Sequence, residues 1–500
     1  MTTPTKILSF LLIICTLAGY AAFSPDGIPA LKSQEPAQTD KPMNVIFILS
    51  DDHRYDFMGF MDTPAFLETP NLDRIRAKGM HIKNAFVSTA LCSPSRASIL
   101  TGQYAHKHGV IDNQRLVPEG TIFFPQLLQD VGYQTAFYGK WHMGDANDDP
   151  RPGFDEWVSF RGQGDYYNPT LNVNGNRSQH QGYTADILTD YSLDWLQNDR
   201  DPNKPFFLYL SHKSVHAMFE PSETDLGRYD DEALTYPSTM ANTEENYAGH
   251  PPWVREQRYS WHGVDYMYHG DMDFDTFYRR YTETLTSMDR SIGRVLDYLE
   301  ESGLEENTLV IYMSDNGFSF GEHGLIDKRH MYEESMRVPM LAYAPGLIEP
   351  GSSMDEMIQN IDIAPTVLSL AGALVPKNMD GQSFLPLLGG QHIPWRDSVI
   401  YEYYWEWNFP QTPTTLGLRS DKYKYIFYHG TWGDDELFDL QADPAEARNL
   451  FRDENYQGVV GDMRGQLFNI LEDTGGMNIP LRIPQGFRAA ERGSTQRQIQ

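Results

Sequence analysis

The chain has 500 residues, a formal net charge of −29 and two cysteines, and 13% of its residues are aromatic. This acidic balance argues against nucleic acid as a partner, because affinity for nucleic acid depends on Lys and Arg contacts with phosphate. An anionic substrate would therefore have to be attracted by a local basic patch rather than by the field of the whole molecule.

The N-terminus has the charge pattern of a secretory signal peptide. Lys6 precedes the apolar run ILSFLLIICTLAG, and small residues follow in YAAFS, which predicts a cleaved signal peptide over residues 1–24. The run is too short to predict a stable membrane span. Cys15 follows two isoleucines rather than a small residue, which argues against lipoprotein processing. We therefore expect a secreted or periplasmic protein that keeps one cysteine, Cys92, and has no internal disulfide.

Residues 25–42 are polar and contain prolines, which predicts a linker. Short apolar runs follow, and their β-branched and aromatic residues predict buried strands. These runs cover residues 44–50, 134–139, 205–211 and 307–314, and helix-like stretches between them cover residues 71–80 and 189–199. Strands that alternate with helices predict an α/β fold with a large, mostly parallel sheet flanked by helices.

One long helix is predicted after an irregular region. Residues 275–303 carry apolar side chains at helical spacing, begin with an aspartate that can cap a helix and end at Gly303. Residues 217–274 are acidic and aromatic without clear periodicity, which predicts an inserted loop region. Both belong to a main domain that we place at residues 43–389.

The last part of the chain predicts a smaller α+β subdomain over residues 390–480, which carries a short antiparallel sheet. Its strand-like runs cover residues 398–407, 416–428 and 436–440, and its helix covers residues 458–473. A polar tail follows over residues 481–500.

Polar residues follow two of the predicted strands directly. Asp51 and Asp52 come after the first strand, and Asp315 and Asn316 come after the last strand of the main domain. In α/β sheets, ligands gather beyond the carboxyl ends of the strands. Three carboxylates and an amide oxygen at that edge would require a hard cation, Ca²⁺ or Mg²⁺. Asp and Asn are also common turn formers, so each pair alone has a purely structural explanation.

Cys92 is placed where a helix is predicted to begin. Pro94 suits the first turn of a helix that Ser93 can cap, so Cys92 is expected just before the positive end of the helix dipole, where a thiolate or an anion is stabilised. Arg96 is close enough in sequence for both side chains to address one oxyanion. A lone cysteine is often inert and buried, but the polar neighbours of Cys92 favour a reactive position.

The stretch CSPSR at residues 92–96, continuing through ASILTG, resembles the signature of the type I sulfatases of the alkaline phosphatase superfamily. In that family Cys-x-Pro-x-Arg directs conversion of the cysteine to formylglycine (3-oxoalanine) by a separate maturation enzyme. The resemblance extends from NVIFILSDDH to ELFDLQADPAEARNL and makes residues 43–389 the catalytic domain of an alkaline phosphatase-like fold. It implies a hydrated aldehyde, a geminal diol, of which one hydroxyl attacks sulfur while the other later expels sulfate.

The same resemblance implies a metal site and a set of charged residues. One calcium ion would be bound by Asp51, Asp52, Asp315, Asn316 and the modified Cys92. Arg96 matches the residue that fixes the diol, and Lys140 in GKWHMG matches a sulfate ligand. Fixed positive charges of this kind stabilise the charge that develops on sulfate oxygens during attack at sulfur.

Two histidines and a second lysine complete the implied site. His142 matches the histidine beside the diol that helps to break down the sulfated intermediate. His216 matches the histidine that interacts with the leaving oxygen, and Lys328 matches the lysine that bridges sulfate and that oxygen. At His216 the family often has a preceding proline where this chain has Val215, and His212 is a nearby rival. Taken alone, each of these residues would more often be structural.

Aromatic residues in the second half of the chain suggest where a sugar could bind. Tyr266, Trp405 and Trp407 would form sugar-binding walls, or would pack the insertion and the subdomain onto the main sheet. An exported, acidic member of the family resembles secreted bacterial polysaccharide sulfatases. We therefore expect the substrate to be a sulfated polysaccharide or its oligosaccharides.

Three other functions are compatible with parts of this pattern. A phosphatase of the wider superfamily usually binds two zinc ions through additional His and Asp ligands, whereas the acid pairs here suit a single calcium ion. A phosphonate or phosphate diester hydrolase would use the same formylglycine. An inactive protein that binds sulfated glycans would not need the complete signature.

Overall fold

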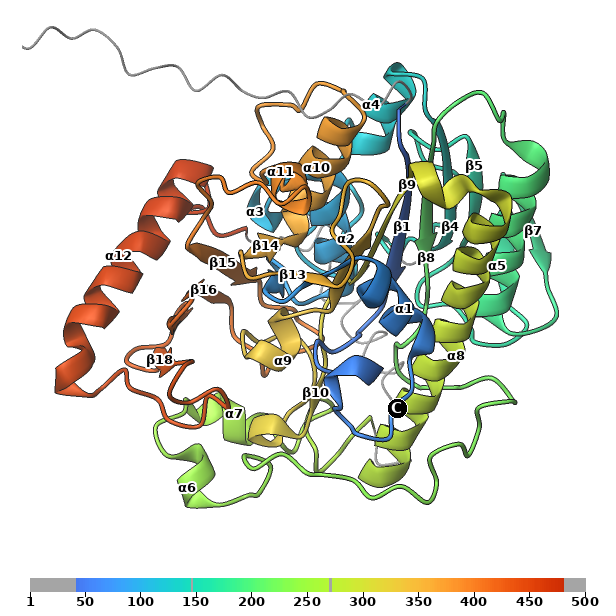
Figure 1. Ribbon diagram of the computed structural model, residues 1–500. Helices are drawn as coiled ribbons and strands as arrows, with labels where there is room; N and C mark the ends of the chain where they lie inside the picture. Colours follow the sequence, from blue (N-terminus) through green and yellow to red (C-terminus); the bar gives the residue numbers. More distant parts are fainter. Residues whose placement is uncertain (1–41, 145–146, 269–271, 481–500) are drawn as a thin grey trace, which may run out of the picture. The chain divides into compact units, whose positions relative to one another are not determined.

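A ten-stranded sheet runs through the part of the chain that the computed structural model describes, which comprises residues 42–144, 147–268 and 272–480 (Figure 1). The predicted signal peptide (1–24), nearly all of the predicted linker (25–42) and the predicted tail (481–500) lie outside the described residues. Along the chain, the strands of this sheet are β1 (Asn44–Ser50), β2 (Met80–Ile82), β4 (Gln134–Lys140), β5 (Glu156–Phe160), β6 (Thr170–Val173), β7 (Asn176–Gln179), β8 (Phe206–Ser211), β9 (Thr308–Ser314), β12 (Met340–Tyr343) and β13 (Ser352–Met354).

The sheet is mixed, with a parallel centre. Its strand order is β13-β2-β12-β9-β1-β8-β4-β5-β6-β7, and the five consecutive strands from β9 to β5 are parallel to one another. Ser50 of β1 pairs with Ser314 of β9, and Leu49 of β1 pairs with Ser211 of β8. These strands therefore end at one edge of the sheet. The predicted fold class, a large and mostly parallel sheet flanked by helices, is confirmed.

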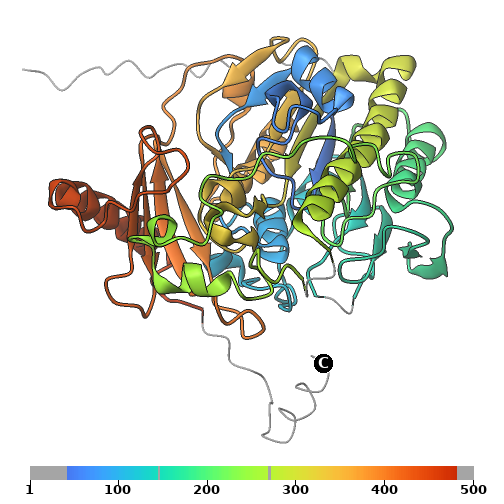
Figure 2. The same ribbon diagram turned by 90° about the horizontal axis from the view of Figure 1, so that it is seen from below.

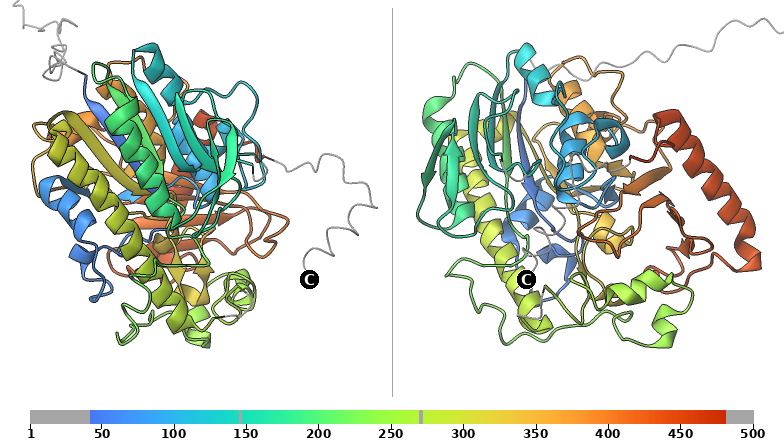
Figure 3. Two further views of the ribbon diagram at one scale, coloured as in Figure 1. Left: turned by 90° about the vertical axis from the view of Figure 1, so that its right-hand side faces the viewer. Right: turned by 180° about the vertical axis from the view of Figure 1, so that it is seen from behind.

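Helices cover both faces of this sheet because its central strands are apolar on both sides. In β1, Val45, Phe47 and Leu49 face one core, whereas Ile46 and Ile48 face the other. Figure 1 and the right-hand view of Figure 3 show the molecule from opposite directions. The first core contains residues from α2 (Cys92–Thr101), α4 (Phe124–Asp130) and α10 (Ile363–Leu370), and the second contains residues from α1 (Pro70–Lys78), α5 (Thr184–Asp194) and α8 (Phe274–Ser302).

The capping residue of the long helix α8 lies two residues earlier than predicted. The Asp273 side chain, not that of Asp275, caps the helix by accepting a hydrogen bond from the Thr276 backbone N–H at 2.8 Å. Gly303 ends the helix, as predicted, with a φ of 72° that favours glycine.

The region predicted as an insertion, residues 217–274, contains two short helices, α6 (Glu244–Tyr247) and α7 (Pro252–Gln257), and is otherwise irregular in its described part. Its boundaries stay a prediction. Other short elements of the described chain are α3 (Ala105–His108), α9 (Glu333–Met336), α11 (Leu385–Leu388), β3 (Ala85–Phe86), β10 (Ser319–Phe320), β11 (Ile326–Asp327) and β14 (Ile358–Gln359).

A separate antiparallel sheet forms near the C-terminus, as predicted. Its strands, in order, are β15 (Ser398–Tyr403), β16 (Thr415–Ser420), β17 (Tyr423–Tyr428) and β18 (Glu436–Asp439). Figure 2 shows α12 (Gln457–Thr474) covering one face of this sheet, where Leu418 and Tyr425 pack with Leu467 of the helix. Ile426 and Phe438 point to the opposite face and join the main core. No helix among the described residues combines the length and the hydrophobicity of a membrane span.

Two acids of α8 contact α1 in contrasting environments. The buried carboxylate of Asp289 accepts hydrogen bonds from the backbone N–H groups of Asn71 and Leu72, at 3.0 and 2.8 Å, in the first turn of α1. These N–H groups have no partner inside their own helix. Asp297 forms an exposed ion pair with Arg74 at 2.6 Å.

Replacing these two acids tests whether the buried carboxylate contributes more to the free energy of unfolding than the exposed ion pair does. We expect Asp289→Ala to lower the free energy of unfolding by about 1–3 kcal/mol, because it leaves two buried N–H groups without a partner. Asp297→Ala, the control on the same helix, should cost less than about 1 kcal/mol. Urea denaturation of both variants provides the comparison, and equal losses would contradict the assigned role of Asp289.

Candidate active site

The carboxyl ends of β1 and β9 bring two acidic pairs together. Carboxylate oxygens of Asp51, Asp52 and Asp315 all lie within 4.8 Å of one another. The backbone N–H of Asp52 donates to Asp315 Oδ1 at 3.1 Å, and Asn316 Nδ2 donates to Asp52 Oδ1 at 2.6 Å. All four residues are fully buried. The two pairs therefore lie at one sheet edge, as the sequence suggested.

Cys92 lies at the start of α2 and faces these acids. Its Sγ is 3.7 Å from Asp51 Oδ1. Burial raises the pKa of the Cys92 thiol, and the Asp51 carboxylate raises it further. Burial and a neighbouring negative charge thus act against a thiolate here, opposite in direction to the stabilisation expected from the helix dipole.

The helix start also differs from the prediction. Leu91, not Ser93, occupies the capping position of α2, and Cys92 is the first helical residue. The Ser93 hydroxyl instead donates to the His142 carbonyl, and the Ser93 backbone N–H donates to Asn113 Oδ1 at 3.1 Å. Ser93 thus joins α2 to the segment after β4 rather than capping its own helix.

Arg96, one turn after Cys92, joins both acidic pairs. Its Nε donates to Asp315 Oδ2 at 2.8 Å, and its second terminal nitrogen lies 3.0 Å from Asp51 Oδ2. The remaining nitrogen donates to the Lys140 carbonyl and to Ser211 Oγ, both at 2.7 Å. Although burial opposes the charge, Asp315 and Asp51 raise the pKa of Arg96. The guanidinium therefore stays charged in a buried site.

Two lysines contact the carboxylates of Asp51 and Asp52. Lys140 is the last residue of β4, and its ammonium donates to Asp51 Oδ2 and to Gln163 Oε1. Lys328 Nζ lies 2.6 Å from both carboxylate oxygens of Asp52 and 3.3 Å from Asp327 Oδ1. Each buried acid pair is thus neutralised by cations from other segments of the chain.

The acids respond differently to this surrounding charge. Burial alone would raise the pKa of Asp51, but Lys140 and Arg96 hold it well below its usual range. Burial raises the pKa of Asp52 well above its usual range despite the opposing charge of Lys328. Adjacent carboxylates with divergent pKa values are typical of functional sites.

Of the two candidate histidines near residue 215, His216 faces the acids. Its Nε2 is 3.9 Å from Asp52 Oδ2, and its Nδ1 is 2.5 Å from the Ala217 carbonyl oxygen. Burial, together with the charges of Lys328 and Lys140, lowers the pKa of His216 well below its usual value. The rival His212 is fully buried, and its ring nitrogens contact no hydrogen-bond partner among the described residues.

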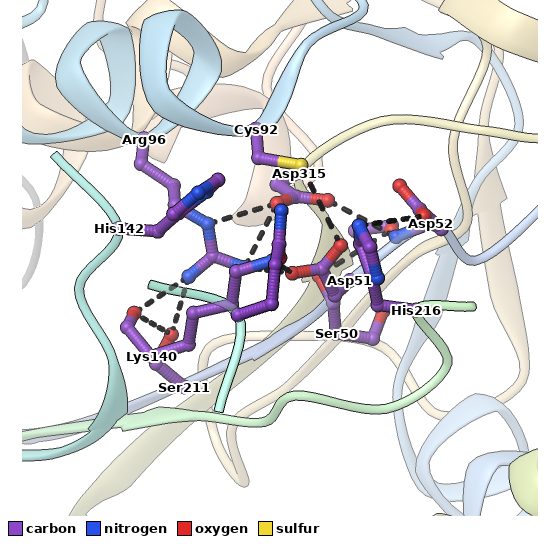
Figure 4. A network of polar contacts seen from close by, with 12 residues as sticks. Ser50, Asp51, Asp52, Cys92, Arg96, Lys140, His142, Ser211, His216 and Asp315 are labelled. Carbon is purple, nitrogen blue, oxygen red and sulfur yellow. Dashed lines mark hydrogen bonds and ion pairs between the residues drawn. The ribbon is translucent and has the colours of Figure 1, made fainter. Parts of the chain in front are cut away.

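Figure 4 shows these side chains converging from separate segments, with Arg96 and Lys140 on one side of Cys92 and His216 and Asp52 on the other. A cavity of about 610 Å³ opens beside them. Residues that line it are Asn113, Gln114, His142, Gly162, Gln163, His216, Ala217, Met218, Trp261, His262, Tyr268, Asp327, Lys328, Arg329, Asn408 and Phe409.

The aromatic walls of this cavity differ from those that the sequence suggested. Tyr266, Trp405 and Trp407 do not line it and are 43%, 45% and 40% exposed. The Trp405 indole N–H donates to the Pro410 carbonyl at 3.3 Å, which keeps this ring on its own loop. Trp261 and Tyr268 from the same predicted insertion, and Phe409 from the same C-terminal loop, line the cavity in their place.

Several residues of the site were missed by sequence reasoning. Asp327 and Arg329 flank Lys328 and line the cavity, so their proximity in sequence was an available signal. Ser211 is the last residue of β8 and contacts Arg96. The rule that ligands gather beyond strand ends would have found it. Gln163 lies in the loop after β5, and nothing in its sequence surroundings indicates its contact with Lys140.

The donor set fits a divalent cation. Asn316 Oδ1 is buried and has no hydrogen-bond partner among the described residues. This amide oxygen, together with the carboxylates of Asp51, Asp52 and Asp315, is the type of ligand that a hard cation prefers. The described residues thus contain an acidic cluster that is suited to one such ion.

Comparison with known proteins agrees with this arrangement. The family model named Sulfatase matches residues 43–373, and the model named N-sulphoglucosamine sulphohydrolase, C-terminal, matches residues 321–473. An N-acetylglucosamine-6-O-sulfatase of Bacteroides thetaiotaomicron is 32% identical over 503 aligned residues, with 87% of this chain and 87% of that protein covered. The human N-acetylglucosamine-6-sulfatase is 34% identical, with 76% of this chain and 71% of that protein covered.

A solved structure described as a complex with its substrate, D-glucosamine-2-N,6-O-disulfate, is also similar. It is 30% identical with a TM-score of 0.81, and the match covers 89% of this chain and all of that chain. The chain therefore belongs to the sulfatase family and is a sulfuric ester hydrolase.

Proposed function

We propose that this enzyme removes sulfate from sulfated glucosamine residues of a polysaccharide or its oligosaccharides. The nucleophile would be formylglycine made from Cys92 by a maturation enzyme after export through the predicted signal peptide, and one calcium ion would be bound. The observation that carries the proposal is the convergence of Cys92 with both acidic pairs and with Arg96, Lys140 and Lys328 beside one cavity.

The proposal assigns the calcium ion and the formylglycine to specific residues. Asp51, Asp52, Asp315 and Asn316 would hold the calcium ion together with the modified residue 92, and the ion would supply positive charge to the sulfate oxygens. Formylglycine would supply a hydroxyl nucleophile in its hydrated form. The carboxylate oxygens of the three aspartates lie together at this edge of the sheet, which supports the proposed place of the ion.

One guanidinium, two ammonium groups and one imidazole of this chain would each have a separate role in the reaction. Arg96 fixes the carboxylates next to residue 92 through its contacts with Asp51 and Asp315. Lys140 and Lys328 present ammonium groups that would neutralise sulfate oxygens in a site with little water. His216 holds its Nδ1 against the Ala217 carbonyl, so its Nε2 is the ring nitrogen available to the leaving oxygen.

The cavity wall supports a carbohydrate as the group that carries the sulfate. Gln114 Oε1 and Asn408 Oδ1 are buried acceptors that have no partner among the described residues. Sugar hydroxyls would supply the missing donors, since buried polar groups are normally hydrogen-bonded. Trp261 and Phe409 line the same cavity and provide apolar surface for a sugar face. The names of the similar proteins point to glucosamine 6-sulfates within this class.

Replacing Cys92 tests the nucleophile. We expect Cys92→Ala to lower kcat roughly 10³-fold or more while the folded structure is kept, because the hydroxyl nucleophile cannot form. In the wild type, mass spectrometry of the peptide that contains residue 92 should show the aldehyde in place of the thiol. Thr101→Ala, on the same helix but outside the cavity, should retain turnover. Normal turnover by Cys92→Ala would overturn the assignment.

Calcium binding can be measured without activity. We expect added Ca²⁺ to raise the thermal midpoint of the wild type, since a ligand that binds only the folded state stabilises it. Asp52→Asn should lose most of this shift. Asp362→Asn, a control at an equally buried carboxylate that pairs with Arg396, should keep it even if the fold is weakened. An undiminished Ca²⁺ shift in Asp52→Asn would contradict the site, and elemental analysis should identify calcium rather than magnesium.

A substrate panel tests the reaction and its substrate together. We expect sulfate release from N-acetylglucosamine 6-sulfate and from oligosaccharides that contain it, and slower release from sugars sulfated at other positions. Product analysis by NMR identifies the desulfated carbon. An aryl phosphate diester is included because a phosphonate or phosphate diester hydrolase would turn it over faster than an aryl sulfate. That result, or binding of sulfated glycans without turnover, would replace the proposal.

A further inference from the structure

We infer that three tyrosine hydroxyls hold the segment that carries His216 and thereby fix this histidine in the cavity. Tyr166, Tyr167 and Tyr183 would be positioning residues for the sulfatase reaction. This inference rests on the proposed function, in which His216 faces the leaving oxygen.

His216 lacks the support that strand ends and a helix give to several other residues of the site. Asp51, Asp315 and Lys140 lie at the ends of strands, and Cys92 begins a helix. In contrast, residues 216–221 lie in neither a helix nor a strand. Regular backbone hydrogen bonds therefore do not fix this segment, and other donors have to satisfy its carbonyl groups.

The tyrosine hydroxyls supply those donors. Tyr166 donates to the His216 carbonyl at 2.7 Å. Tyr183 donates to the Glu220 carbonyl at 3.1 Å, and Tyr167 donates to the Pro221 carbonyl at 2.9 Å. Three side chains of one cluster thus contact three carbonyl groups within a stretch of six residues.

The tyrosine cluster is itself held firmly. The ring of Tyr183 stacks with that of Tyr166, with centroids 6.2 Å apart, and lies 5.1 Å from that of Tyr167. The Thr184 backbone N–H donates to the Tyr166 carbonyl at 2.8 Å, which joins the two parts of the chain that carry the cluster. On the side of the active site, the Lys213 ammonium lies 4.3 Å from the centroid of the Tyr166 ring. The cluster can therefore act as a fixed support.

The hydrogen bond from Tyr166 restrains the imidazole of His216 because it is made to the backbone of the same residue. The His216 backbone N–H donates to the Lys213 carbonyl at 3.0 Å, while its own carbonyl accepts from Tyr166. Its ring Nδ1 contacts the Ala217 carbonyl at 2.5 Å. Backbone and ring are thus both restrained, and Nε2 is left to face the cavity and Asp52.

The chemistry of the leaving group makes this role measurable. A sugar alkoxide is a poor leaving group that depends on a histidine beside its oxygen, whereas 4-nitrophenolate leaves readily without that help. Misplacing His216 should therefore slow sugar sulfates much more than 4-nitrophenyl sulfate. A general weakening of the fold would slow both substrates alike.

Steady-state kinetics of tyrosine variants with N-acetylglucosamine 6-sulfate and 4-nitrophenyl sulfate tests the inference. We expect Tyr166→Phe to lower kcat for the sugar sulfate about tenfold while changing kcat for 4-nitrophenyl sulfate less than about twofold. Tyr183→Phe and Tyr167→Phe should show the same selectivity with smaller losses. Tyr133→Phe is the matched control, since the Tyr133 hydroxyl also donates to a backbone carbonyl, that of Met43 at 2.7 Å, but far from the cavity.

A double-mutant cycle adds a second, independent readout. In the His216→Ala background, Tyr166→Phe should cause no further loss, because the residue through which it acts is gone. Equal losses on both substrates, or a full additional loss in that background, would overturn the inference. If Tyr166→Phe fails to fold, Tyr183→Phe and Tyr167→Phe decide the question in the same assays. If the wild type releases sulfate from neither substrate, that result would instead refute the proposed function.

Discussion

The active site depends on one buried guanidinium that joins the ends of two strands. Arg96 donates to Asp51 after β1 and to Asp315 after β9, and it is 1% exposed. Buried carboxylates are costly unless a cation and further hydrogen bonds satisfy them, and Arg96 provides both. Because Cys92 lies four residues earlier on the same helix, it is about one turn away. The contact that neutralises the acids therefore also sets the position of the proposed nucleophile.

Local charge, rather than the net charge of −29, governs what the cavity can bind. Lys140 and Lys328 lie against Asp51 and Asp52, and Arg329 lines the same cavity. These cations are buried and act at short range, where their field is far stronger than that of exposed acids screened by salt. An acidic protein can thus place buried cations next to a bound sulfate ester, although each of these cations is also paired with a carboxylate.

Strands and helices position most of the charged groups of the site, whereas loops line much of the cavity. The sheet and α2 fix the charged groups, since strand ends and helix starts are rigidly placed. The predicted insertion and the C-terminal loop line the cavity with Trp261, Tyr268 and Phe409. His216 belongs to an irregular segment, although it faces the acids. Loops on a rigid scaffold commonly carry specificity. Here His216 faces the acids from a loop segment, and tyrosine hydroxyls donate to backbone carbonyls of that segment.

The sequence by itself determined the buried strands, the acids that follow them and the signature around Cys92, because each depends on residues close together in the chain. It did not determine that Leu91 rather than Ser93 occupies the N-cap position of α2, nor that burial and the Asp51 carboxylate raise the pKa of the Cys92 thiol. It also suggested Trp405 as a cavity wall, whereas Phe409 occupies that place. Burial and the neighbours of a charge arise from contacts between separate segments of the chain, such as those that carry Asp51 and Cys92, so only the tertiary structure decided them.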